Sequence, residues 1–310
     1  MTVATIRRFR RRRPAVIVAA VAAAVLVLAP GVASAGVTDL PVKTTSANEV
    51  AAGADGAWLG WSQAPSGSAS YQALASESGG SPISLGENGK VATMGGIEGN
   101  TAVFQQNDTA SDWNIYRYDL NQQQRTKYGT KVNTTGKEFK PTVSGGRLLF
   151  GRVVAAGTET IRVFTPSSGK TRVLDTIHAT FTDSVAPGQI NGKYVVWHRC
   201  APKCNVFEWN RQADTTTKLV NGSGKNQWFP AVAPDGTTYY VREGVQCESV
   251  AKIVEDPLNG PPQVIFTLPD DTTAAHLFVD DAGSMGRNVY YSAVHCTSPL
   301  TYDVRMLDLS

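Results

Sequence analysis

The fold of this chain is decided by the stretch Gly192-Lys193-Tyr194-Val195-Val196-Trp197, because its pattern recurs along the sequence. A glycine, four further residues and a large apolar residue occur six times: Gly56–Trp61, Gly99–Phe104, Gly145–Phe150, Gly192–Trp197, Gly236–Val241 and Gly286–Tyr291. Successive glycines of this set are 43, 46, 47, 44 and 50 residues apart. A period near 45 residues, built from strand-like segments, is typical of a propeller or a solenoid.

Each repeat has the pattern of four short strands. In the third repeat we predict strands over Phe139–Ser144, Arg147–Val153, Thr160–Thr165 and Lys170–Asp175, separated by turns that contain glycine. Four-stranded antiparallel units that repeat radially form a β-propeller, in which each unit packs face to face against its neighbours. We therefore predict an all-β fold, a six-bladed β-propeller of four-stranded antiparallel blades.

The two ends of the chain indicate how the ring closes. The sixth repeat supplies only three strands, over Leu277–Asp280, Arg287–Ser292 and Tyr302–Asp308. A spare strand-like segment, Val37–Thr44, precedes the first repeat. We predict that this N-terminal strand completes the last blade, because closure removes exposed sheet edges.

Residues 1–35 have the composition of a secretory signal peptide. Six arginines precede a continuous apolar run over Pro14–Ala29, and Ala33-Ser34-Ala35 provides a small-residue cleavage site. We expect cleavage after Ala35, no transmembrane segment in the mature chain, and a secreted or cell-envelope location. The sequence does not distinguish the Sec export route from the twin-arginine route. After cleavage, we expect residues 36–310 to form one propeller domain.

Removal of the leader changes the charge balance. The whole chain has 29 basic and 26 acidic residues, and the six leader arginines leave 23 basic residues and a net charge of −3. No basic stripe follows residue 36, so nucleic acid is not an expected partner. A mature chain of this size suits one closed all-β domain, and we expect a monomer.

One repeat resembles a known family. Phe229-Pro230-Ala231-Val232-Ala233-Pro234-Asp235-Gly236, followed by an apolar strand, is similar to the TolB-type propeller repeat (WD40-like), although Ala233 replaces its usual serine. Ala54-Asp55-Gly56 and Pro141–Gly146 are degraded copies. The resemblance implies a six-bladed, exported bacterial propeller that acts as a platform for protein interactions. We expect no counterpart of the additional N-terminal domain of TolB or of the hydrolase domain of prolyl oligopeptidase relatives.

The mature chain has four cysteines, Cys200, Cys204, Cys247 and Cys296. An even number in an exported chain is typical of disulfides. Cys200 and Cys204 can close across one hairpin, and Cys247 and Cys296 could then join adjacent loops. A metal site is the alternative, because His198 and His295 adjoin two of the cysteines, but the spacing matches no zinc module.

The residues that lead into the first strands should surround one mouth of the central channel. These positions include Glu138, Asp183, Gln227, Trp228 and His276. We expect them to bind a protein, peptide or glycan, with Trp228 as an aromatic anchor. The alternative interpretations are that Glu138 and Asp183 are ordinary solvated loop residues and that Trp228 packs between blades.

An enzyme is the second hypothesis. The chain has no nucleophile elbow, phosphate loop or His-Glu-x-x-His motif, and its four histidines are scattered. Some six-bladed propellers hold calcium in the channel and act as lactonase-like hydrolases, and Glu138 and Asp183 could contribute oxygen ligands. We expect a binding module without a cofactor, with a calcium-dependent hydrolase as the alternative.

Overall fold

We describe the protein from a computed structural model, which covers residues 37–309 apart from 155–156, 181, 220–223, 244–246, 248 and 282–286. The predicted signal peptide and its cleavage after Ala35 lie outside these residues. The described residues of the compact unit Ala35–Ser310 form strands and one short 3-10 turn over Pro166–Ser168. Among them we find no helix with the length and apolarity needed to cross a bilayer.

The strands follow one another as antiparallel hairpins, as the repeat predicts. Their bounds in chain order are β1 Thr38–Lys43, β2 Asn48–Asp55, β3 Trp58–Ala64, β4 Gln72–Glu77, β5 Ile83–Ser84, β6 Ala92–Glu98, β7 Thr101–Thr109, β8 Asp112–Asp119, β9 Gln124–Lys127, β10 Lys137–Ser144, β11 Arg147–Val154, β12 Thr158–Thr165, β13 Lys170–His178, β14 Ser184–Asn191, β15 Tyr194–Cys200, β16 Cys204–Asn210, β17 Thr215–Lys218, β18 Gln227–Val232, β19 Thr238–Arg242, β20 Lys252–Asp256, β21 Gln263–Thr267, β22 Thr272–Asp281, β23 Arg287–His295 and β24 Thr301–Asp308.

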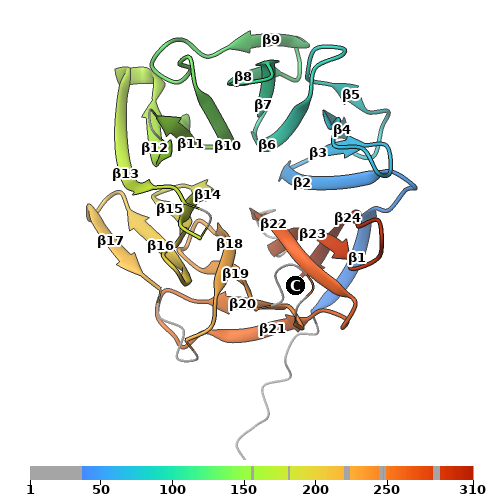
Figure 1. Cartoon of the computed structure of the whole chain (residues 1–310), viewed down its shortest axis with the longest axis vertical. Coiled ribbons are helices and arrows are strands. Elements are labelled where there is room, and N and C mark those ends of the chain that lie inside the picture. Colours follow the sequence, from blue (N-terminus) through green and yellow to red (C-terminus); the bar gives the residue numbers. More distant parts are fainter. Residues whose placement is uncertain are drawn as a thin grey trace, which may run out of the picture. The chain divides into compact units, whose positions relative to one another are not determined.

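The fold is all-β, with a propeller-like arrangement of four-stranded antiparallel blades (Figure 1). Four blades are separate sheets, with strand orders β2-β3-β4-β5, β14-β15-β16-β17, β18-β19-β20-β21 and β22-β23-β24-β1. The other eight strands form one sheet, in which the units β6–β9 and β10–β13 are joined by a single parallel pairing of Lys137 with Trp113. Of the six predicted blades, four are therefore separate sheets, and this bridge merges the other two four-stranded units into one eight-stranded sheet.

The first strands lie innermost and form a closed cycle. Each of β2, β6, β10, β14, β18 and β22 contacts the next, and β22 contacts β2 (Figure 1). The N-terminal strand closes the ring as expected, since β1 pairs antiparallel with β24. Asp39 of β1 also accepts hydrogen bonds from the Nε of Arg305, at 3.0 Å, and from the hydroxyl of Tyr291, at 3.0 Å.

The repeated glycine lies in the turn between the first and second strands. Its φ is 59° at Gly56, 54° at Gly99, 59° at Gly145, 53° at Gly192 and 96° at Gly236, values that glycine adopts without steric cost. The turn amide also binds the preceding unit: Gly99 N donates to Asp55 Oδ2 at 2.5 Å, and Gly192 N donates to Ser144 Oγ at 3.1 Å. The glycine therefore shapes the hairpin and links it to its neighbour.

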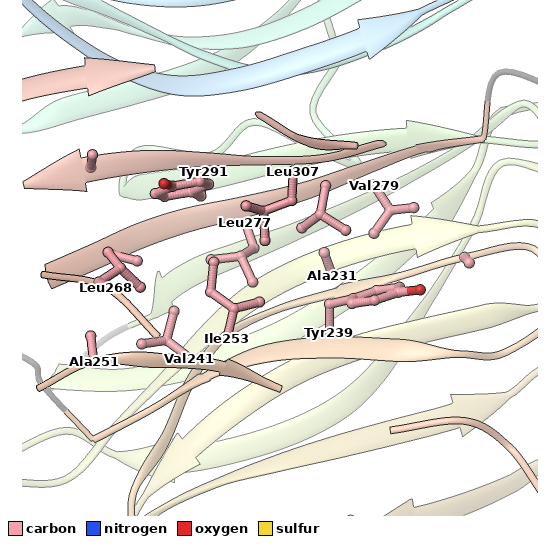
Figure 2. Close-up of a cluster of buried hydrophobic side chains, with 14 residues drawn as sticks. Ala231, Tyr239, Val241, Ala251, Ile253, Leu268, Leu277, Val279, Tyr291 and Leu307 are labelled. Atoms are coloured by element: carbon pink, nitrogen blue, oxygen red, sulfur yellow. The ribbon is translucent and has the colours of Figure 1, made fainter. Parts of the chain in front are cut away.

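The core lies between adjacent sheets. Figure 2 shows the largest cluster, in which side chains of β18–β20 face those of β22–β24, with Val241, Ile253, Leu277 and Tyr291 among them. The large apolar residue of the repeat is at most 1% exposed in every copy: Trp61, Phe104, Phe150, Trp197, Val241 and Tyr291. Its burial explains why the pattern recurs, since each blade needs a bulky side chain against the next.

Candidate functional site at the channel

Every innermost strand contains a β-bulge, which breaks its register with the second strand of the same unit. In β10, β18 and β22 the bulged residues are Lys140, Phe229 and His276, whose φ angles are +47°, +49° and +50°. Positive φ is uncommon outside glycine, and bulges commonly redirect side chains beside functional sites. These three residues line the same cavity in the channel, although they come from three different strands.

This channel cavity has a volume of about 50 Å³. Its walls also include Gly95 and Gly188, where the innermost strands approach each other closely. A Cβ on Gly95 would lie 2.0 Å from the carbonyl oxygen of Pro141, and one on Gly188 would lie 2.1 Å from that of Pro230. Glycine is therefore required at both positions, and it allows the strands to narrow the channel.

A larger hollow adjoins the channel cavity on the face that carries the cysteines. This loop-face hollow has a volume of about 400 Å³ and shares Phe229 and His276 with the channel cavity. Apolar side chains form most of its wall, and Leu300 at its rim is 44% exposed. Its lining is Phe229, Cys247, Thr273, Ala274, Ala275, His276, Val294, Cys296, Leu300 and Tyr302.

Aromatic rings and one cation meet at the junction of the two spaces. The ring of Phe229 has its centroid 5.6 Å from those of His198 and His276, and 6.3 Å from that of Trp228. Lys140 Nζ lies 5.2 Å from the centroid of Phe229, which is within cation–π range. Of these groups, Phe229, His276 and Lys140 line the channel cavity, so a ligand there would meet two rings and one positive charge.

Burial controls the charge of this junction. Burial lowers the pKa of both His198 and His276 to about 3, with a further lowering by the charge of Lys140. Burial also lowers the pKa of Lys140 to about 8, although the carboxylate of Glu159 raises it. Near pH 7 the two imidazoles are neutral, and Lys140 carries the charge. His198 Nδ1 is buried and has no hydrogen-bond partner among the described residues.

The structure brings two of the predicted binding residues together. Trp228 and His276 both lie against Phe229, and both are partly exposed. Trp228 also packs against the largest core cluster, which agrees with the packing alternative, and it is not among the residues that line either space.

The other three predicted residues are engaged elsewhere. Glu138 is 0% exposed, and its Oε1 accepts hydrogen bonds from Arg152 Nε and the Thr134 hydroxyl, both at 2.8 Å. Gln227 is also 0% exposed, and its Oε1 accepts from the backbone N of Val206 at 2.9 Å. The expectation that these two residues surround an open mouth is wrong, because each satisfies polar groups of a neighbouring segment.

Asp183 lies outside the channel cavity, in a local turn. Its backbone N donates to the Thr180 hydroxyl at 3.0 Å, and its Oδ1 accepts from the Thr182 hydroxyl at 3.3 Å. Neither Asp183 nor Glu138 lines the channel cavity or the loop-face hollow. Over the described ranges, no group of three or more His, Cys, Asp or Glu side chains is placed to hold a metal ion.

Sequence reasoning named Glu138 but missed Lys140, the cation of the candidate site. A usable signal was present, because Lys140 and Phe229 each precede a proline within a strand. Proline cannot donate to a sheet ladder and is confined there to edges and bulges. Lys140-Pro141 and Phe229-Pro230 could therefore have been interpreted as bulges, with the residue before each proline redirected.

The cysteines pair as the sequence suggested. Cys200–Cys204 closes the hairpin between β15 and β16, and Cys247–Cys296 joins loops of two consecutive blades. The alternative metal site is excluded, since all four thiols are in disulfides. Cys247–Cys296 also forms part of the wall of the loop-face hollow.

No family model matches the sequence, and no curated protein is similar to it. Solved structures do resemble it. TolB from Acinetobacter baumannii has a TM-score of 0.55 at 12% identity, and the match covers 87% of this chain and 65% of TolB. The propeller domain of the Trilobed protease from Pyrococcus furiosus has a TM-score of 0.53 at 11% identity, covering 86% and 98% of the two chains.

The tricorn protease has a TM-score of 0.56 at 10% identity, covering 81% of this chain and 25% of that protein. The chain thus spans slightly less than two thirds of TolB and a quarter of tricorn. At these identities the likeness concerns the fold alone. Together with the blades and the central channel, it defines the chain as a β-propeller protein.

Proposed function

We propose that this propeller is an extracytoplasmic binding module that holds a protein segment or peptide at the loop-face hollow and the adjoining channel cavity. The observation that carries the proposal is the continuity of these two spaces through Phe229 and His276. Ligand sites are commonly concave and mostly apolar, with a few polar groups that fix orientation. The hollow supplies the apolar surface, and Lys140 and the histidines supply the polar groups.

The wall chemistry favours a peptide over a glycan. Ala274, Ala275, Val294 and Leu300 offer apolar surface, which suits an aliphatic or aromatic side chain. A sugar can stack on Trp228 or Phe229, yet it also needs several hydrogen-bond partners, which this wall provides sparsely. A glycan is therefore the second ligand class in the test below.

The disulfide beside the hollow supports both binding and location. Cys247–Cys296 fixes two loops that border the site, and a preorganised surface loses less entropy on binding. Disulfides persist outside the reducing cytoplasm, which agrees with the arginine-rich leader and its cleavage motif. We propose that the mature chain works as a monomer in the cell envelope or outside the cell.

A pair of tryptophan substitutions tests the proposal. Ala275→Trp fills the loop-face hollow, whereas Asn191→Trp places the same bulk in the cavity at the opposite mouth of the channel. Wild type and both variants are screened against a displayed peptide library and a glycan array, and their melting temperatures are compared. We expect peptide binders of the wild type to be lost with Ala275→Trp and kept with Asn191→Trp.

Trp228→Ala refines the result. An anchor contributes roughly 1–3 kcal/mol to binding, so the variant should bind the selected peptides more weakly while it stays folded. Unchanged binding with a lower melting temperature would assign Trp228 to blade packing. If peptides still bind Ala275→Trp but no longer bind Asn191→Trp, the binding site would instead be assigned to the cavity at the opposite mouth of the channel.

A further inference from the structure

The channel cavity contains a cation, Lys140, that forms no ion pair with any residue that the structure describes. Among the described residues, no carboxylate oxygen is within 4.0 Å of Lys140 Nζ, whereas Lys127, Arg152 and Arg305 each have such a partner. Lys140 is partly buried, and partial burial of an unpaired charge is costly, because it removes part of the hydration of that charge. An anion that enters the cavity would offset that cost.

The backbone holds Lys140 in this position. The bulge gives Lys140 its positive φ of 47°, and its backbone N donates to Gln105 Oε1 at 2.6 Å. The side chain then lines the channel cavity beside His276 and Phe229. The cation is therefore built into the wall rather than carried on a mobile surface loop.

The surrounding charges leave Lys140 available to a ligand. The groups that act on it are Glu159, whose negative charge raises the pKa of Lys140, and the imidazoles of His198 and His276, which are neutral near pH 7. The carboxylate of Glu159 already accepts a hydrogen bond from the backbone N of Val185 at 3.0 Å. Lys140 thus remains the only lysine or arginine among the described residues that line the channel cavity.

We propose that Lys140 binds one carboxylate group of the peptide ligand inside the channel cavity, while the rest of the peptide occupies the loop-face hollow. This inference rests on the proposed function and adds the chemistry of the ligand. A cavity of about 50 Å³ holds only a few water-sized groups, so a carboxylate fits there and an aromatic ring does not. The carboxylate comes from a peptide C-terminus or from an Asp or Glu side chain.

Nuclear magnetic resonance of the lysine ε-methylene groups tests the site on the wild-type protein. The probes are three short N-acetylated peptides with the same apolar residue: one with a free C-terminus, one amidated, and one amidated with an internal aspartate. We expect the carboxylate probes to shift the Lys140 signal and raise its apparent pKa, and the amidated neutral probe to leave it unchanged. The first and third probes separate the two carboxylate sources.

A matched pair of variants gives the second readout. Lys140→Met should weaken binding of the carboxylate probes at least tenfold and leave the neutral probe unaffected. Lys137→Met is the control, because Lys137 lies on the same strand with Nζ 5.8 Å from the centroid of Trp113, but on the exposed surface. The wild-type titration remains decisive even if Lys140→Met folds poorly.

Two outcomes separate this inference from the proposed function. If no carboxylate probe shifts Lys140 at millimolar concentration, or if Lys140→Met binds them as well as wild type, the carboxylate site is refuted. If Ala275→Trp nevertheless abolishes binding of the same peptides, the loop-face hollow would still be supported as the binding site. Carboxylate-dependent shifts that survive Ala275→Trp would support the Lys140 site and reject the hollow.

Discussion

The side chain of Gln189 pairs with the backbone of Val279 across the channel. Its Oε1 accepts a hydrogen bond from Val279 N at 3.0 Å, and its Nε2 donates to Val279 O at 2.8 Å. The same Oε1 accepts from Val232 N at 3.2 Å, so one residue of β14 links β18 and β22. Gln189 is 3% exposed and lines the cavity at the turn end of the channel.

Replacing Gln189 by leucine should destabilise the whole ring. The change leaves the polar backbone groups of Val279 and Val232 buried without this partner, and each such group costs about 1–3 kcal/mol. We expect a loss of roughly 2–5 kcal/mol in the free energy of unfolding, measured by urea denaturation. Gln122→Leu on an exposed turn is the control, and an equal effect there would contradict the role of Gln189.

Deleting residues 37–44 should lower stability far more than loss of a terminal segment usually does. Strand β1 pairs with β24 along its length, and Asp39 binds Arg305 and Tyr291, so the deletion exposes a sheet edge and breaks the ring. Asp39→Ala, which keeps the strand, should cost only about 1 kcal/mol because the ion pair is partly exposed. Calorimetric melting of both variants checks this order, and equal melting temperatures would refute closure by β1.

The two disulfides should differ in their contribution to stability. Cys247 and Cys296 are 49 residues apart, whereas Cys200 and Cys204 are only 4 apart. By chain entropy, the long loop contributes about 4 kcal/mol and the short one about 2 kcal/mol. Denaturant unfolding of the two paired Cys→Ser variants measures the difference. A larger loss from Cys200→Ser/Cys204→Ser would show that chain entropy is not the controlling term.

Stability should fall as the pH drops from about 6.5 toward 3. The folded pKa of His198 is about 3 because burial disfavours the imidazolium, whereas an unfolded histidine titrates near 6.5. Between these values the unfolded chain binds the extra proton, so each such histidine contributes a slope of about 1.4 kcal/mol per pH unit. Urea unfolding of wild type and His198→Asn across this range should show a shallower slope in the variant. Parallel slopes would mean that His198 is charged when folded.

Glu138→Ala should affect stability rather than binding. The Glu138–Arg152 pair is buried, with an Nε–Oε1 distance of 2.8 Å, and removing one partner of a buried ion pair costs about 3–5 kcal/mol. We expect a lower melting temperature and unchanged affinity for the selected peptides at a temperature where the variant is folded. Weakened binding without a change in melting would restore Glu138 to the ligand site.

The local pattern of the sequence determined much of the fold. The turn glycines, the buried residue five positions later and the alternation of strands act over a few residues, so they can be interpreted without knowledge of distant segments. The Cys200–Cys204 disulfide could also be predicted locally, because both cysteines belong to one hairpin. The missing strand of the last repeat predicted that β1 closes the ring.

The tertiary structure decided the site and the number of separate sheets. A single parallel strand pairing, Lys137 with Trp113, joins two units into one sheet, and no local pattern predicts it. Whether a polar residue beside the channel is exposed depends on neighbours that are distant in sequence. Glu138 is buried against Arg152 across the hairpin, and Gln189 reaches Val279, 90 residues away. Lys140 lines the channel cavity because a β-bulge redirects the backbone at this residue. The position of the bulge depends on the register between the first and second strands of the unit, and the residue type alone does not determine it.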